Sequence, residues 1–238
     1  MYEYMEKYNG GLYISDELRE LLVSLGDVKE MKRNTYLFSQ GMDAKEVYLI
    51  QSGIVQISMM SSEGAEMTLR ICKQDDIVGE LTLYCDNPTY LLHAKVIKSG
   101  KVIAVNIDRL HEELRCNHLL AIEMMKWISN HMRKYQLKMK DLLLNGKKGA
   151  LFSTLIRLSN SYGVQQKNGV LIDIGLTNQQ LANFCGASRE YVNRMLTQLR
   201  EKDVISRVPS NRMIIKDLEY LKNENNCERC PVEVCNIN

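Results

Sequence analysis

The sequence contains no long apolar run. No stretch approaches the roughly 18 consecutive apolar residues that mark a membrane-spanning helix, so we expect no membrane span. The opening segment MYEYMEKYNGG carries acidic side chains and has no apolar core, which argues against a secretory signal. The protein is therefore expected to be cytoplasmic.

Net charge is also small. Lys and Arg number 31 against 29 Asp and Glu, so any basic surface for nucleic acid must be local. Motifs of common enzymes are missing, because the chain has no G-x-S-x-G, no dinucleotide-binding fingerprint and no HExxH spacing. The histidines are scattered, at His93, His111, His118 and His131. We therefore do not expect an enzyme.

Short β-rich runs separated by glycine fill residues 35–106. Such runs at roughly ten-residue spacing are typical of an antiparallel barrel or roll. Ser52-Gly53 and Glu63-Gly64 are predicted to form hairpin turns. The interior of such a barrel or roll binds a ligand in some proteins and is filled by the protein's own side chains in others.

A long helix is predicted over residues 117–145, which contain no Gly or Pro. Its apolar residues recur at alternating spacings of four and three, at Ala121, Met125, Ile128, Met132, Tyr135, Met139 and Leu142. A seam of this kind is typical of self-associating helices, so we expect a homodimer. The alternative is a core helix of a single domain. The following Gly146-Lys147-Lys148-Gly149 is predicted to be a hinge.

The stretch LTNQQLANFCGASREYVNRMLTQLREKDVIS predicts two short helices and a turn. Thr177 and Gln180 form a capping box that opens a helix through Phe184. Gly186 permits a positive φ at the turn, and Ser188 caps a second helix.

The second of these helices is predicted to have two faces. At 100° per residue, one face is apolar and the other is polar; the polar one carries Arg189, Glu190, Asn193 and Arg194. The β-prone pairs that follow, at 204–205 and 213–215, indicate a winged hairpin. Together these features favour a DNA-binding helix-turn-helix over a surface helix pair with solvated charges.

The motif SREYVNR, the β-rich region ending in IVGEL and the long helix together resemble the cyclic-AMP receptor/fumarate–nitrate regulator (CRP/FNR) family of bacterial transcription factors. The resemblance covers essentially the whole chain. It implies an α+β fold with an antiparallel β-roll like that of cyclic-nucleotide-binding domains (1–116), a dimerisation helix and hinge (117–146), a winged helix-turn-helix (147–223) and a cysteine-bearing tail (224–238). RNA polymerase is an implied partner.

The same resemblance indicates the DNA-binding residues. The family's recognition helix carries Arg-Glu-x-x-x-Arg, which falls here on Arg189, Glu190 and Arg194. Arginine bonds guanine O6 and N7, and glutamate accepts from cytosine N4, so we expect a two-fold operator similar to TGTGA–N6–TCACA. Helix N-termini favour phosphate, and three further DNA-contacting residues are expected there: Ser188, Thr177 and Asn178.

The roll departs from the nucleotide-binding members of the family. Gly79-Glu80 matches the start of their nucleotide loop, but their Arg-Ser pair for the cyclic phosphate is missing, and 87–90 reads Asn-Pro-Thr-Tyr. Burial of a phosphate without these donors is costly, so cyclic AMP is not expected. Glu80 is instead predicted to be a structural or interface residue.

Three of the seven cysteines lie together in the tail NNCERCPVEVCNIN. Cys227, Cys230 and Cys235 could bind a metal or one face of an iron–sulfur cube, with structural zinc or reduced thiols as alternatives. The other four are predicted to be small buried hydrophobes: Cys72, Cys85, Cys116 and Cys185.

The tail resembles that of the family's bacillar members, which implies a 4Fe–4S cluster. In these proteins an aspartate near the end of the dimer helix is the fourth ligand, and Asp141 is at the matching position. The sequence alone also allows Cys116, Cys185, a histidine or water. The implied function is an oxygen-responsive regulator of nitrate respiration and fermentation. The alternative is a regulator that responds to a small molecule and has structural zinc in its tail.

Overall fold

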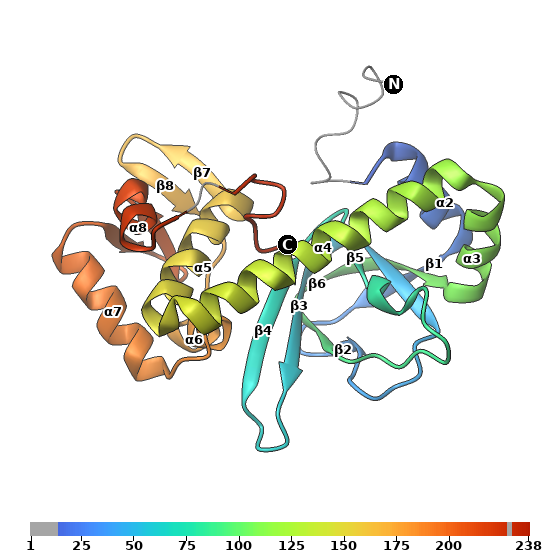
Figure 1. The fold of residues 1–238 in the computed structure, drawn as a ribbon, viewed down its shortest axis with the longest axis horizontal. Coiled ribbons are helices and arrows are strands. Elements are labelled where there is room, and N and C mark those ends of the chain that lie inside the picture. Colours follow the sequence, from blue (N-terminus) through green and yellow to red (C-terminus); the bar gives the residue numbers. More distant parts are fainter. Residues whose placement is uncertain (1–13, 228–229) are drawn as a thin grey trace. The chain divides into compact units, whose positions relative to one another are not determined.

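The computed structural model describes residues 14–227 and 230–238 of the chain. It divides into two units, each with its own internal contacts (Figure 1). Among these residues, the first unit contains 14–66, 70–132 and Asn238, and the second contains 67–69, 133–227 and 230–237. Among the described residues, no helix has the length and apolar character needed to cross a bilayer.

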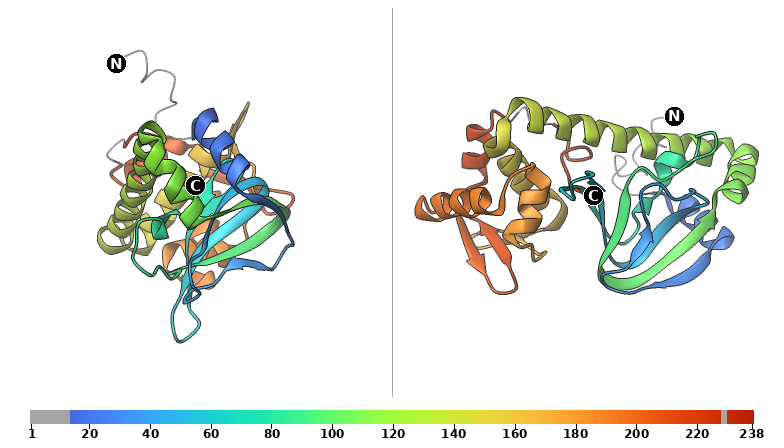
Figure 2. Two further views of the ribbon diagram at one scale, coloured as in Figure 1. Left: turned by 90° about the vertical axis from the view of Figure 1, so that its right-hand side faces the viewer. Right: turned by 90° about the horizontal axis from the view of Figure 1, so that it is seen from below.

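An antiparallel sheet forms the first unit. Its strands are β1 (Asp27–Met31), β2 (Tyr36–Phe38), β3 (Glu46–Met60), β4 (Glu66–Cys72), β5 (Ile77–Val78) and β6 (His93–Asn106). The order is β1-β6-β3-β4, with β2 paired to β6 and β5 to β3. Figure 2 shows these strands curving around one side of the unit. Apolar side chains from the strands form the buried core. The predicted antiparallel roll is confirmed.

One of the two predicted hairpin turns is wrong. Ser52-Gly53 lies inside β3, which runs unbroken from Glu46 to Met60 beside β6. Gly53 has a φ of +90°, and a Cβ there would lie 2.6 Å from the carbonyl oxygen of Lys98. The glycine therefore permits close approach of two strands at a bulge, which resembles a turn signal in sequence. Gly64, with a φ of +82°, does form the turn between β3 and β4.

Helices α2 (Asp16–Leu25) and α3 (Ile107–Cys116) pack against β6 and against each other. Ser15 caps α2 by accepting from the Leu18 amide. The backbone N–H and hydroxyl of Ser15 also donate to the Glu123 carboxylate, each at 2.6 Å. Because Glu123 lies on α4 (His118–Leu144), this contact ties the N-terminus of α2 to the long helix.

Helix α4 has close to the predicted length and exposes the methionines of the predicted seam. Met125, Met132 and Met139 are 50%, 47% and 59% exposed. Ala121 and Ile128 of the seam are instead partly buried against the core of the first unit. A different stripe of the helix is buried in its own chain, at Met124, Trp127, His131, Lys134, Lys138 and Asp141. Pairing through the seam stays a prediction.

An ion cluster is buried in the first unit. Arg70 Nη1 lies 2.8 Å and His131 Nδ1 3.1 Å from Glu80 Oε1, and Arg70 and Glu80 are each 3% exposed. Burial alone raises the pKa of Glu80, but the charge of Arg70 and the hydrogen bond of His131 outweigh it and lower the pKa to about 2. Glu80 is thus a structural residue, as predicted.

The second unit contains the remaining elements. They are α5 (Gly146–Tyr162), β7 (Gly163–Gln166), β8 (Gly169–Ile172), α6 (Asn178–Cys185), α7 (Arg189–Glu201), β9 (Ile205–Val208), β10 (Arg212–Ile215) and α8 (Leu218–Glu224). The four strands form a sheet in the order β7-β8-β10-β9, and β9 and β10 make the predicted wing.

The predicted hinge at residues 146–149 is too long. The break between α4 and α5 falls at Asn145 and Gly146, where Gly146 has a φ of +61°, and residues 147–149 lie in the first turn of α5. A Cβ on Gly149 would lie 2.4 Å from Cβ of Asn145 and 2.7 Å from Oδ1 of Asn225. This glycine therefore serves close packing within a helix, and its proximity to Gly146 in sequence mimics a flexible linker.

We expect Glu80→Gln to lower the free energy of unfolding by about 3 kcal/mol, because it leaves the Arg70 charge buried without its carboxylate. The pKa of Glu80 is depressed, so its contribution is present above pH 4.5 and is lost as pH falls toward 2. The difference between wild type and variant should therefore shrink over this range in urea unfolding.

Glu30→Gln is the matched control, since Glu30 pairs with Lys101 at the surface, where the side chains are 68% and 54% exposed. Glu30→Gln should lower the free energy of unfolding by less than about 1 kcal/mol. Equal effects of the two substitutions would contradict the assignment of Glu80 to a buried charge cluster.

Candidate functional site

The local geometry of the helix-turn-helix follows its sequence closely. Thr177 and Gln180 form a reciprocal capping box at the start of α6. Gly186 ends that helix with a φ of +56°, and the hydroxyl of Ser188 accepts from the Tyr191 amide at the start of α7. The predicted caps and turn are confirmed, because each depends on neighbouring residues only.

Helix α7 separates a buried face from an exposed one. Val192, Met195, Leu196 and Leu199 are buried. Arg189, Glu190 and Arg194 are exposed, and the Arg194 guanidinium lies 5.3 Å from the centre of the Tyr191 ring. The three predicted base-contacting residues therefore face solvent from the first turns of the helix, where a major groove would be read.

A groove of about 470 Å³ runs along this face. It is lined by Thr177, Asn178, Gln179, Arg189, Asn193, Leu196, Arg200, Arg207 and Asn211. The side-chain amide of Asn178 donates to Asn193 at 3.0 Å, and its oxygen accepts from Arg207 of the wing. Asn178, predicted to bind phosphate, is thus held between the wing and α7.

Two guanidiniums in this groove were missed by sequence reasoning. Arg207 and Arg200 come from the wing and from the end of α7. Partial burial, followed by the nearby charge of Arg200, lowers the pKa of Arg207 from its usual value. The sequence pattern of the wing predicts its two strands, but it does not predict which of their side chains point toward α7. The result is a local positive surface in a chain of almost neutral net charge.

A second cavity contains all four predicted metal ligands. Cys227, Cys230, Cys235 and Asp141 line it together with residues of α4, α5 and the segment after α8. Its volume of about 40 Å³ accommodates a few water molecules, and a four-iron cluster would need more room. Among residues 14–227 and 230–238, no three His, Cys, Asp or Glu side chains are already arranged to hold a metal ion.

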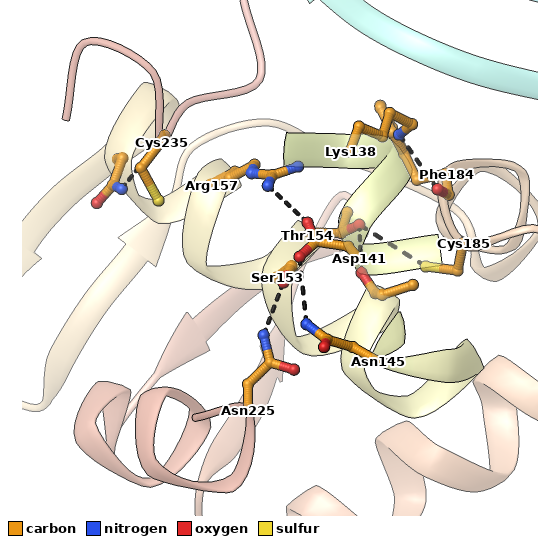
Figure 3. Close-up of polar contacts among 12 residues, drawn as sticks. Lys138, Asp141, Asn145, Ser153, Thr154, Arg157, Phe184, Cys185, Asn225 and Cys235 are labelled. Carbon is orange, nitrogen blue, oxygen red and sulfur yellow. Dashed lines mark hydrogen bonds and ion pairs between the residues drawn. The ribbon is translucent and has the colours of Figure 1, made fainter. Parts of the chain in front are cut away.

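Asp141 is buried beside an arginine. It is 8% exposed, and its Oδ2 lies 2.5 Å from Nη2 of Arg157 on α5 (Figure 3). Its Oδ1 accepts from the Asn145 amide at 3.3 Å. Oδ2 makes no well-aligned hydrogen bond, so the guanidinium compensates it mainly by charge.

The chemistry of the donors fits an iron–sulfur cluster. Three sulfurs and one carboxylate oxygen border one cavity, and thiolates are the usual ligands of cluster iron. Burial raises the pKa of the Cys235 thiol, while the charge of Arg157 and a hydrogen bond from it act in the opposite direction. Deprotonation of this thiol is therefore helped by a cation that already lies next to it.

Lys138 is a further buried cation that the sequence did not single out. Its Nζ donates to the Phe184 carbonyl at 3.2 Å, which links α4 to the last turn of α6. Burial, then the charge of Arg157, lowers the pKa of Lys138 from 10.5 to about 7. A signal was available, because Lys134, Lys138 and Asp141 continue the four-and-three spacing of the buried stripe.

None of the other four cysteines lines this cavity. Cys72 and Cys185 are buried, as predicted, whereas Cys85 and Cys116 are exposed, so that part of the prediction is wrong. Burial raises the pKa of Cys185 to about 11, and its sulfur lies 3.8 Å from the Thr154 hydroxyl. Cys185 is therefore an inert packing residue.

Comparison with protein families matches two parts of the chain. Residues 150–224 match the Crp-like helix-turn-helix domain. Residues 28–116 match the cyclic nucleotide-binding domain. The matched ranges coincide with the winged region and with most of the roll.

Among curated proteins, the anaerobic regulatory protein of Bacillus subtilis (strain 168) is 55% identical over 224 residues, covering 94% of each chain. The lactate racemization regulatory protein of Lactiplantibacillus plantarum is 31% identical over 80% of this chain and 87% of its own. Among solved structures, a CooA mutant from Carboxydothermus hydrogenoformans superposes with a TM-score of 0.75 at 18% identity, covering 90% of this chain and 99% of its own.

We expect Arg207→Ala to weaken binding to duplex DNA of any sequence and to reduce the slope of log affinity against log salt by about one, because a phosphate contact is lost. Arg194→Ala should instead reduce the favourable binding free energy by about 1–3 kcal/mol for operators that contain the guanine read by Arg194, and have little effect on operators in which that guanine is replaced. Titrations of labelled duplexes at several salt concentrations measure both effects.

Lys101→Ala is the control for charge alone, since Lys101 is an exposed cation on β6, outside the groove. It should leave affinity and salt slope unchanged. A loss for Arg207→Ala that depends on base sequence would contradict its assignment to the DNA backbone.

Proposed function

Since the chain belongs to the CRP/FNR family of transcription regulators, we propose that it is the oxygen-responsive type that acts under anaerobic conditions. It binds a 4Fe–4S cluster through Cys227, Cys230, Cys235 and Asp141. As a homodimer it binds a two-fold operator similar to TGTGA–N6–TCACA, and with RNA polymerase it controls genes of nitrate respiration and fermentation. The name of the 55% identical Bacillus subtilis protein supports the anaerobic role.

One observation carries the metal part of this proposal. Three thiols at 227–235 and a carboxylate 86 residues earlier, at Asp141, line the same cavity, within the unit that holds the helix-turn-helix. The short loop alone accounts for the proximity of the thiols, but not for the fourth donor. When bound, the cluster would supply iron–ligand bonds that oxygen destroys, with the carboxylate as a harder and weaker ligand than thiolate.

The ligands belong to elements that support the recognition helix. Asp141 comes from α4, whose Lys138 bonds the end of α6. The tail follows α8, and Asn225 at its start donates to Ser153 of α5 at 2.7 Å. A cluster bound to Asp141 and to the tail cysteines would therefore hold α4 and the tail in place against α5. Because α6 and α7 pack on these elements, cluster binding would favour the arrangement of α7 that binds DNA.

We expect Cys227→Ser to abolish cluster binding and to lower operator affinity to that of air-treated wild type, a change of about 5–150-fold for a typical allosteric coupling. Protein is purified and reconstituted without oxygen. Iron and acid-labile sulfide are assayed, and operator binding is measured before and after exposure to air.

Cys85→Ser is the control, because Cys85 is exposed and belongs to the roll. It should retain iron, sulfide and affinity. Iron-free Cys227→Ser protein that binds its operator as tightly as loaded wild type would refute the switch. If the wild type contained zinc and no acid-labile sulfide, the tail would be a structural zinc site and not an iron–sulfur site.

The dimer should depend on the seam of α4 and not on the cluster. We expect wild type to sediment as a dimer with and without iron, because the seam contains none of the proposed ligands. Met132→Glu should give monomers, since it places charges opposite each other across the seam. The matched control is Met59→Glu, because Met59 is 43% exposed on β3, against 47% for Met132. A dimeric Met132→Glu variant would exclude this seam.

A further inference from the structure

Arg157 lies at two of the four proposed ligands. Its guanidinium Nη2 is 2.5 Å from Asp141 Oδ2, and its charge opposes the rise that burial causes in the pKa of the Cys235 thiol. Figure 3 shows it between these two side chains, which come from α4 and from the tail. Arg157 itself is 8% exposed and lines the ligand cavity from the middle of α5.

Positive charge is already buried at this cavity. Arg157 lines it and pairs there with Asp141. If Asp141 bound a metal instead, the guanidinium would need another anion, because a buried charge without a partner is unfavourable. Thiolates and the sulfides of a cluster are such anions.

We propose that Arg157 is the positioning residue of the tail site: it holds Asp141 toward the cavity while no metal is present and remains as counter-ion once Asp141 binds iron. This inference rests on the function proposed above. With a cluster bound, Asp141 Oδ2 would exchange its ion pair with Arg157 for iron, and each cysteine would release its thiol proton to solvent as it became a thiolate ligand. The guanidinium would keep its charge, and its N–H groups would be free to bond sulfur.

An arginine suits this role better than a lysine. A guanidinium presents several N–H donors in one plane, so it can bond a carboxylate on one side and a sulfur on another. It also keeps its charge when buried, whereas a buried lysine ammonium loses its proton far more readily. A positive group that lost its proton would leave both Asp141 and the thiolates without compensation.

The first arm of the test uses full-length, metal-free protein and needs no cluster. Urea unfolding is measured for wild type, Arg157→Gln, Asp141→Asn and the double variant. Each single change leaves a buried charge without its partner, so both should destabilise, and the double variant should regain part of the loss. We expect a coupling of about tenfold in the unfolding equilibrium constant. Additivity within twofold would overturn the proposed pairing.

The second arm loads each protein anaerobically and measures iron content, midpoint potential and the lifetime of the visible spectrum in air. Cluster potential depends on nearby charge and on hydrogen bonds to sulfur. We expect Arg157→Gln to shift the potential to more negative values and to shorten the lifetime about tenfold. Arg157→Lys should restore the potential more than the lifetime, because it returns the charge without the planar donors.

Arg33→Gln is the control, since Arg33 is exposed in the first unit and should change none of these readouts. If wild type binds iron and Arg157→Gln has the same midpoint potential and the same lifetime in air as wild type, this inference is overturned and the proposed function stands. Wild type that binds no iron would overturn both the proposed function and the role of Arg157 at the cluster.

Discussion

The charges on the buried stripe of α4 impose the constraint on which both units depend. A helix that buries charged side chains must meet partners of opposite sign, because an unpaired charge in the interior costs several kcal/mol. In the first unit His131 Nδ1 lies 3.1 Å from the Glu80 carboxylate, which pairs with Arg70, and in the second unit Asp141 pairs with Arg157. Each pair fixes the rotation of α4 against its own surroundings far more strictly than apolar packing would. The same rotation leaves the methionine seam outside.

The two units differ in what surrounds these charges. In the roll, Arg70 lies 2.8 Å from Glu80, so the buried carboxylate has its positive partner within the unit. In the second unit, Asp141 pairs with Arg157 at a cavity that three thiols also line. Under the proposed function, the response to oxygen would therefore arise in the unit that holds the recognition helix.

Sequence patterns predicted what depends on near neighbours. The capping box at Thr177, the Gly186 turn and the Ser188 cap were predictable because each involves residues within four positions. Gly53 and Gly149 were misinterpreted, because close approach to a distant backbone or side chain has the same local signal as a turn or hinge. Asp141 became a candidate ligand only through family resemblance, and its role as a ligand stays a prediction. Arg157 was missed, because a partner 16 residues away on another helix follows no periodicity.

The exposed methionines of α4 have a chemical consequence. Thioethers in water are open to peroxide, and the resulting sulfoxide is polar and poorly suited to an apolar interface. Met125, Met132 and Met139 are about half exposed in one chain, and pairing along the seam would shield their sulfur atoms. Newly made, unpaired chains would therefore be the ones most vulnerable to reactive oxygen, and rapid assembly would protect them before any metal is inserted.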